Sequence, residues 1–316
     1  MTGGGRSLAF FALASVLFGG TFVAAKAGLG YFPPLLFVAL RFDVAAVALL
    51  AYVAATSSRE ELLPRTVHDV IGVLATGVLA IGLANALLFV GQQHVTSGVG
   101  SIIFSLNPIL TPVFAAVLLA DERLSARGAL GLLVGLLGVA LVVQPDPANL
   151  LGGGAVGKGI MFAGAVSGAL GSVLIRWADT SLSSTVRTAW ALPVSALLSH
   201  GFSVAAGESA AAIAWTPAAV LALGYVGILA GAVAYIAYFG LLDEVGAIRG
   251  NLVFYVVPVV ATLGGSALLG ESVSTLSLVG FATIFAGFAV LGGDRLAAGA
   301  RRVRAAVATR TASDAV

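Results

Sequence analysis

Apolar runs of about 20 residues follow one another along the chain, separated by short stretches that carry charge, proline or glycine. As an α-helix, a run of this length rises about 30 Å, the thickness of the hydrocarbon core of a bilayer. The runs are apolar on every side, which predicts helices rather than the alternating strands of a membrane barrel. We predict ten transmembrane helices, at roughly 8–28, 35–55, 69–92, 96–119, 126–143, 158–178, 184–205, 217–241, 247–269 and 275–292.

The same order of residue types occurs twice. Residues 91–143 are echoed by residues 242–292 about 150 positions later, and residues 11–26 are echoed by residues 162–177. Each half of the chain then holds five helices. Because five is odd, the second half enters the membrane from the opposite face, which predicts two inverted repeats related by a two-fold axis in the membrane plane.

The repeat and the charges together predict the domain organisation. We expect a first five-helix repeat over 1–148, a second over 149–293 and a basic tail over 294–316. If the N-terminus is cytoplasmic, most arginines fall on the inner side, and only Lys26 and Lys158 lie outside. This bias predicts a multi-pass protein of the plasma membrane with both termini in the cytoplasm.

The composition excludes a soluble globular domain, since 59% of the residues are hydrophobic and 9% are charged. There is no cysteine, so disulfides and thiolate metal sites are excluded, and the three histidines are too scattered for a metal. The sequence also lacks the motifs of intramembrane proteases, and we predict that the protein is not an enzyme. The expected partners are a small-molecule substrate and the lipid bilayer, with no cofactor or nucleic acid, and the chain is expected as a monomer or homodimer.

Two phrases identify a family resemblance: LFGGTFVAAKAGLGYFPPLLFVALRF, and TSGVGSIIFSLNPILTPVFAAVLLADERLS with the glycine-rich helix after it. They resemble the EamA-type repeat of the drug/metabolite transporter superfamily, over nearly the whole chain. The resemblance implies a ten-helix carrier with a central cavity and cytoplasmic ends. Two positions depart from the family pattern, because Phe18 stands in place of tryptophan and Asp43 in place of an apolar residue.

Polar residues recur on equivalent helix faces of the two repeats. Ser97, Ser101 and Ser105 are four residues apart and share one face, and Asn251 and Tyr255 lie on the corresponding face of the second repeat. The pattern predicts a polar cavity, although serines also serve helix packing in membranes. The predicted cavity residues are Ser97, Ser101, Ser105, Asn251, Tyr255, Asn85, Tyr235, Tyr238, Thr21, Ser172 and Trp190.

Prolines interrupt the same helices. Pro108, Pro112 and Pro258 each remove a backbone donor and bend the helix that contains them. The bends are candidate hinges or gates of a carrier, or fixed kinks that shape the bundle.

Two charges lie inside the second predicted helix. Arg41 and Asp43 are two positions apart, about 200° around the helix axis, so they face different neighbours. Arg41 is a candidate for a structural role or for binding an anionic part of the substrate, and Asp43 is a candidate for proton coupling.

These patterns together predict a secondary active transporter of a small organic metabolite. An amino acid or a related zwitterionic or aromatic solute is the expected substrate, with export by alternating access between the two repeats. A passive channel for the same solutes is the alternative, since inverted repeats also build pores.

Overall fold

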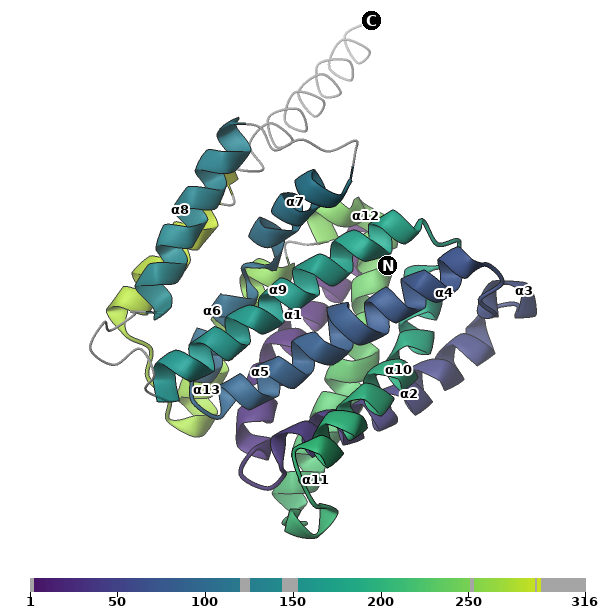
Figure 1. Cartoon of the computed structure of the whole chain (residues 1–316), viewed down its shortest axis with the longest axis horizontal. Coiled ribbons are helices and arrows are strands. Elements are labelled where there is room, and N and C mark those ends of the chain that lie inside the picture. Colours follow the sequence, from purple (N-terminus) through teal and green to yellow (C-terminus); the bar gives the residue numbers. More distant parts are fainter. Residues whose placement is uncertain (1–2, 120–125, 144–152, 251–252, 288, 291–316) are drawn as a thin grey trace, which may run out of the picture.

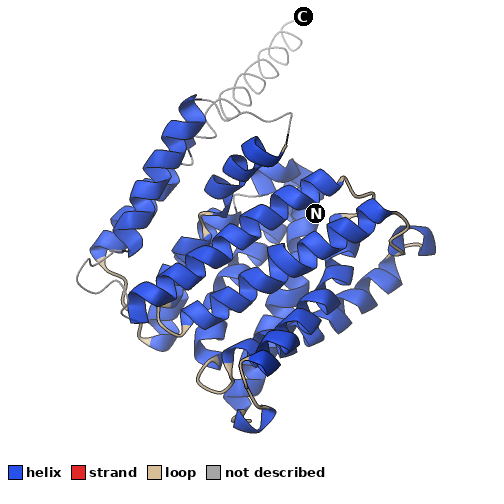
Figure 2. Cartoon of the chain, in the orientation of Figure 1, coloured by secondary structure: helices blue, strands red, loops and turns tan. Residues whose placement is uncertain are grey.

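The computed structural model describes residues 3–119, 126–143, 153–250, 253–287 and 289–290. Within these ranges all regular structure is helical and no strand occurs (Figure 2). The elements are α1 (Gly3–Gly28), α2 (Pro34–Thr56), α3 (Arg59–Leu62), α4 (Val67–Leu74), η1 (Ala75–Leu83), α5 (Ala84–Gln92), α6 (Ser97–Phe104), α7 (Asn107–Leu118), α8 (Ala126–Val143), α9 (Gly153–Ala178), α10 (Ser184–Ala205), η2 (Ala210–Ala212), α11 (Pro217–Gly224), η3 (Tyr225–Val233), α12 (Ala234–Gly250) and α13 (Val253–Leu269), followed by an apolar helix at Thr275–Gly287.

Along the described residues these elements form ten helical spans, so the predicted all-α membrane fold is confirmed. Six of the spans are long and apolar enough on their own to cross a bilayer. The predicted helix at 96–119 is in fact two helices, α6 and α7, separated by a turn at Ser105 and Leu106. The predicted end at 241 is wrong, because α12 continues to Gly250 and therefore contains Ala247, which we had placed in the next helix.

The third span of each half contains a π-helical segment that the sequence did not predict. The two segments, η1 and η3, begin at residues 75 and 225 and end at residues 83 and 233, so both pairs of ends are 150 positions apart. A π turn closes its hydrogen bonds over five residues, is rare in proteins and often lies at functional sites. It holds more residues than an α turn, and the side chains after it are therefore rotated around the helix axis.

α1 and α9 hold equivalent places in the two halves but run in opposite directions. Lys26 Nζ, near the end of α1, donates to the carbonyl oxygen of Gln92 at the end of α5 over 2.7 Å. α5 is the last part of the third span, which begins with α4. At that other end, His68 Nδ1 in α4 lies 2.7 Å from the carbonyl oxygen of Ala178, the last residue of α9. The two equivalent helices thus end on opposite sides of the bundle, as an inverted repeat requires.

The helix pairings repeat in the same way (Figure 1). α1 packs on α13 and on η3 with α12, and its counterpart α9 packs on α7 and on η1 with α5. α2 packs along its own counterpart, α10, and α6 packs along α13. Every one of these contacts joins a helix of one half to a helix of the other, so the two halves interlock over their whole length.

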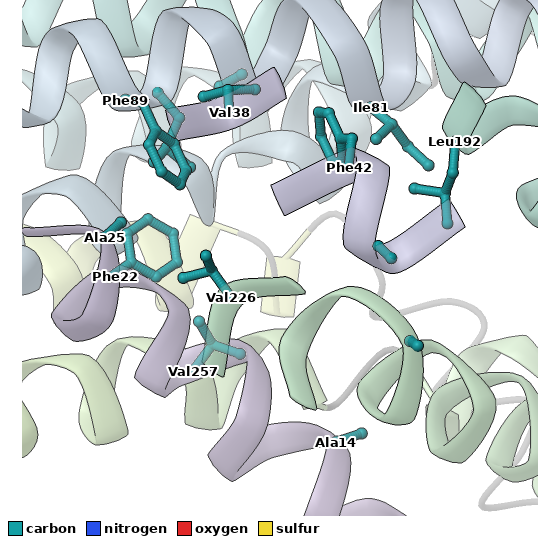
Figure 3. Packing of buried hydrophobic residues seen from close by; sticks show 14 of the residues in the cluster. Ala14, Phe22, Ala25, Val38, Phe42, Ile81, Phe89, Leu192, Val226 and Val257 are labelled. Carbon is teal, nitrogen blue, oxygen red and sulfur yellow. The ribbon is translucent and has the colours of Figure 1, made fainter. Parts of the chain in front are cut away.

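The apolar core lies where the halves meet (Figure 3). Phe42 of α2 is fully buried near Ile81 of η1 and Leu192 of α10. Because lipid is as apolar as these side chains, close packing rather than the hydrophobic effect stabilises such contacts in a membrane.

Carboxylates of one half cap helix starts of the other. α2 begins with Pro34 and has no capping side chain of its own. The Glu208 carboxylate, in the loop after α10, accepts hydrogen bonds from the backbone N–H groups of Leu35 and Leu36 at 3.1 and 2.6 Å, and from Ser203 Oγ at 2.9 Å. A negative charge at this place satisfies two free N–H groups and complements the helix dipole.

Glu271 has the same function at α6. Its carboxylate accepts a hydrogen bond from Ser97 N at 2.9 Å, so it caps a helix of the first half. The helix that Glu271 caps therefore belongs to the opposite repeat. Glu122, its sequence equivalent, lies outside the described residues.

A third carboxylate, Asp69 at the start of α4, accepts more hydrogen bonds than either Glu208 or Glu271. Its Oδ1 atom accepts hydrogen bonds from Thr180 Oγ1, Ser181 N and Ser181 Oγ at 2.8 to 3.0 Å. Its Oδ2 atom accepts from the backbone N–H groups of Arg65 and Thr66, both at 3.1 Å. Asp69 is fully buried and ties the start of the third span to the loop before α10.

Glycines allow the last helices of the two halves to approach each other closely (Figure 1). A methyl group on Gly138 of α8 would lie 2.6 Å from Ile284 N and 2.7 Å from the carbonyl oxygen of Gly280. We expect Gly138→Ala to lower the free energy of unfolding by about 1–3 kcal/mol, because backbone atoms cannot move aside. The midpoint of thermal unfolding in detergent measures the change.

The matched control is Gly201→Ala, since a methyl group there would have no atom within 4 Å. In a helix interior this change is expected to be neutral or slightly stabilising. Equal unfolding midpoints for the two variants would contradict the close approach of these helices.

Candidate functional site

A buried arginine lies in the middle of the bundle. Arg41 on α2 is 3% exposed, and its Nη1 atom donates to Asn85 Oδ1 at 3.2 Å. The guanidinium carbon lies 5.1 Å from the centre of the Phe42 ring and 5.3 Å from that of Phe89. Arg41 Nε has no hydrogen-bond partner within the described part of the chain. A fixed positive charge with a free donor is therefore enclosed among aromatic rings.

The π segments bring the partners of Arg41 to this place. Asn85 is the second residue after η1, and its Nδ2 atom donates to the carbonyl oxygen of Ile81 at 2.8 Å, which fixes the amide oxygen toward Arg41. Tyr235, its equivalent in the second repeat, is the second residue after η3 and lies within electrostatic range of Arg41. The sequence singled out Asn85, Tyr235 and Arg41 separately, and the structure brings all three together.

Aromatic side chains from both halves extend this group. The ring of Phe18 on α1 lies 5.3 Å from that of Tyr235 and 5.9 Å from that of Tyr238, and it stacks on Phe254 of α13 at 6.0 Å. Tyr238 lies 5.4 Å from Phe254. The sequence showed Phe18 only as a departure from the family pattern, and its place between the two tyrosines was missed.

We call this group the Arg41 cluster. Its members are Arg41, Asn85, Phe18, Tyr235, Tyr238 and Phe254. A guanidinium binds carboxylates through paired N–H donors, and aromatic rings pack against apolar or aromatic groups. The arrangement can therefore hold a small molecule that has a carboxylate at one end and a ring or apolar chain at the other.

The predicted serine stripe on α6 is engaged by backbone. Ser97, Ser101 and Ser105 are buried, and their hydroxyls donate to the carbonyl oxygens of Phe22, Gly98 and Ser101 at 3.2, 2.7 and 2.9 Å. In this conformation the stripe serves the packing alternative, and its place in a cavity stays a prediction.

Three other predicted cavity residues also bond to backbone. Thr21 and Ser172 donate to the carbonyl oxygens four residues before them, at 3.1 and 2.9 Å. Trp190 Nε1 donates to the carbonyl oxygen of Leu62 at 2.7 Å, so its indole is tied to the end of the bundle that carries α3. None of these hydrogen bonds, all within the described residues, joins the Arg41 cluster.

The second polar face lies largely beyond what the structure describes. Asn251 falls outside the described residues, and Tyr255 is in α13 with its side chain outside them. Pro108 is in the first turn of α7, so the helix breaks before it, while Pro112 and Pro258 lie inside α7 and α13. Whether these prolines act as hinges stays a prediction.

Asp43 faces away from the Arg41 cluster, as the spacing predicted. Its Oδ2 atom lies 2.8 Å from His200 Nε2. His200 lies within α10 and lines the same groove as Asp43. In the described part of the chain no group of three or more histidines and acids could hold a metal ion.

Comparison with known families gives two matches to one profile. The EamA-like transporter family matches residues 5–144 and again residues 156–293. The two matched ranges together cover most of the chain and fall on its two halves.

Several proteins are similar over most of their length. An uncharacterized transporter of Archaeoglobus fulgidus is 23% identical over 89% of this chain and 96% of its own. The uncharacterized transporter YyaM of Bacillus subtilis is 28% identical over 86% and 89%, and the uncharacterized inner membrane transporter YedA of Escherichia coli K12 is 26% identical over 87% of both chains. A solved crystal structure superposes with a TM-score of 0.61 over 90% of this chain and 96% of that chain, at 23% identity, and shows the same fold.

Proposed function

Because this chain belongs to the EamA-like transporter family, and is thus a multi-pass membrane transporter and not an enzyme, we propose that it is a secondary active carrier of small organic solutes. The proposed substrate class is amino acids and related zwitterionic or aromatic carboxylates. Both termini are proposed to lie in the cytoplasm, in line with the distribution of arginines.

The Arg41 cluster is the observation that carries the proposal. The Nε of Arg41, which has no partner among the described residues, and the adjacent N–H groups suit the carboxylate of a solute, and the Asn85 amide lies beside them. Phe18, Tyr238 and Phe254 offer rings against which a solute ring packs, at centroid distances like those they have with one another. A buried arginine without a full set of partners is costly in a membrane, which supports a functional role.

Alternating access is the proposed mechanism because the cluster draws on both halves. Arg41 and Asn85 come from the first half, and Tyr235, Tyr238 and Phe254 come from the second. Rocking of two interlocked inverted halves would expose such a site first to one side and then to the other. Arg41 is 3% exposed in this conformation, as we expect of a site that is closed to both sides between these two openings.

Counterflow in proteoliposomes tests the proposal. A thermal-shift screen of amino acids and aromatic carboxylates first selects the solute that stabilises the protein most. Vesicles loaded with that solute are then expected to accumulate its labelled form transiently from outside. The amide of the same solute is the matched control, and it is expected to give no accumulation because it lacks the carboxylate for Arg41. Equal counterflow of acid and amide would contradict the site, and flux without overshoot would indicate a channel.

Outward movement is part of the proposal. Cells that produce the protein are expected to release the selected solute faster than cells that produce an Arg41→Gln variant at the same level. Equal release would contradict export through this site.

A further inference from the structure

A pair of titratable groups lies on the opposite side of α2 from the Arg41 cluster. The side chains of Asp43 and His200 are 47% and 41% exposed, and their Oδ2 and Nε2 atoms are 2.8 Å apart. One helical turn from each, Val47 and Leu197 are 72% and 75% exposed. The groove around the pair, of about 400 Å³, is lined by Asp43, Ala46, Val47, Leu50, Pro193, Ala196, Leu197 and His200. Every other lining residue is apolar, so this face is suited to lipid.

The pair lies well inside the spans. Asp43 is nine residues from the start of α2, about 13 Å by helical rise, and His200 is five residues from the end of α10, about 8 Å. Ionisable groups at this depth are costly on a lipid-facing surface, and a functional role is the default hypothesis for them.

Within the described residues, His200 and Asp43 face only each other among charged and titratable groups. On α2 and α10 the other charges are Arg41, which points inward to Asn85, and Arg187, which lies by Ser184 at the far end of α10. Tyr52, also on α2, lies nine residues beyond Asp43 toward the other end of the helix. Of the remaining helices packed on α2 or α10, η3 carries Tyr225, which donates to carbonyl oxygens of α1, and α4 carries His68, which bonds to Ala178. α12 carries Tyr235 and Tyr238, which belong to the Arg41 cluster, and Glu244, which pairs with Arg6. Asp69 and the charged residues of α3 lie at the far end of α2, and Glu208 is engaged at its start.

The charge of the pair depends on one proton. With a neutral imidazole, the pair carries one net negative charge, and Nε2–H donates a single hydrogen bond to the carboxylate. When the imidazole binds a proton, the two charges cancel and the bond becomes an ion pair, which is the stronger form. An apolar groove tolerates a neutral pair better than an isolated carboxylate.

We propose that Asp43 and His200 form a proton-binding site that couples the conformation of the carrier to pH. Asp43 belongs to the first half and His200 to the second, and α2 and α10 pack along each other at the axis that relates the halves. Proton binding ties the halves together in the closed conformation, and proton release frees Asp43 for a conformation in which water reaches it. This inference rests on the proposed carrier function, to which it adds protons as the coupling ion.

The first measurement follows the proton itself. Nitrogen-15 NMR of the histidine side chains in nanodiscs is expected to show the imidazole of His200 binding a proton as the pH falls. His200→Gln removes this signal and so assigns it. Asp43→Asn is expected to change the His200 titration and to leave those of His68 and His94 unchanged. A His200 titration unaffected by Asp43→Asn would overturn the site.

The second measurement follows the conformation and needs no solute. The chain has no cysteine, so spin labels can be attached at Glu60→Cys in the first half and Trp177→Cys in the second, both exposed at the same end of the bundle. The distance between the two labels is expected to have two populations, one for the closed conformation and one for the open conformation. Between pH 5.5 and 8, we expect the ratio of these populations to change by about threefold or more. Asp43→Asn and His200→Gln should both abolish this change, and a response that is absent in the unsubstituted carrier or retained in both variants would overturn the proposal.

A third measurement addresses the competing occupant of this face, a second copy of the chain. Cysteine introduced at Val47 is expected to stay monomeric under oxidation in liposomes, because lipid covers the groove. Efficient cross-linking between copies would overturn the proposal by showing that the pair is part of a dimer interface. Because none of these readouts involves a transported solute, their failure would leave the counterflow result standing.

Discussion

Arg41→Gln is expected to weaken the binding of a carboxylate solute by at least about 30-fold, or about 2 kcal/mol. The guanidinium is the one positive charge that the described residues place among the Arg41 cluster, and its Nε has no other partner there. Glutamine keeps a polar group near Asn85 but removes the charge and the paired donors. Isothermal titration with the solute selected by thermal shift measures the loss.

Arg187→Gln is the matched control. Arg187 is another partly buried arginine whose Nε lacks a partner among the described residues, but it lies near Ser184 in the first turn of α10. We expect the Arg187→Gln variant to bind the solute with an affinity within about twofold of that of the unsubstituted chain, since Arg187 lies outside the Arg41 cluster. If folded Arg41→Gln protein binds as tightly as the unsubstituted chain, the solute binds elsewhere. Should that variant unfold, Tyr238→Phe and Phe18→Ala test the same site through its rings.

Asp69→Asn is expected to lower the free energy of unfolding by about 3 kcal/mol or more. The buried carboxylate accepts five hydrogen bonds, from Arg65, Thr66, Thr180 and Ser181, of which three are from backbone N–H groups. An asparagine has one acceptor atom in place of two, and its amide N–H would face donors that it cannot satisfy. Hydrogen bonds to charged groups contribute about 1.5–3 kcal/mol each, so the loss of several is severe.

Asp179→Asn, in the loop that Asp69 holds, serves as the control. Asp179 has a φ of 46°, in the left-handed region, which asparagine adopts as readily as aspartate. Its unfolding free energy is expected to stay within about 0.5 kcal/mol of the unsubstituted chain. Denaturant titration in mixed micelles compares the two variants, and an equally small effect of Asp69→Asn would contradict the structural role of this carboxylate.

Most of the fold could be predicted because long apolar runs have one stable form in a bilayer. α10 begins and ends where the sequence pattern predicted, at residues 184 and 205, since polar turns bound it on both sides. The end of α12 was wrong because Asp243 and Glu244 resemble a loop. Helices continue into charged sequence once they leave the hydrocarbon, and here Glu244 pairs with Arg6 at 3.0 Å.

The candidate site could be predicted only in pieces. The repeat pointed to Asn85 and Tyr235, but nothing in the sequence joined them to Arg41, which is 44 residues from Asn85. Uniformly apolar spans give no periodic signal that separates a π turn from an α turn, so the rotation that brings these side chains together was invisible. The capping partners of Glu208 and Glu271 are more than 170 residues away, and no local motif marks them.

The matching positions of η1 and η3 also bear on when the two π segments arose. A π segment arises when a helix accommodates surplus sequence without breaking, and two unrelated insertions would rarely fall at residues 75 and 225, the same place in each repeat. The same irregularity at the same place in both repeats is what we expect if it was present before the half-length sequence was duplicated. The two repeats differ at the second residue after this segment, with Asn85 in one and Tyr235 in the other, so the surroundings of the single arginine are asymmetric although the backbone is not.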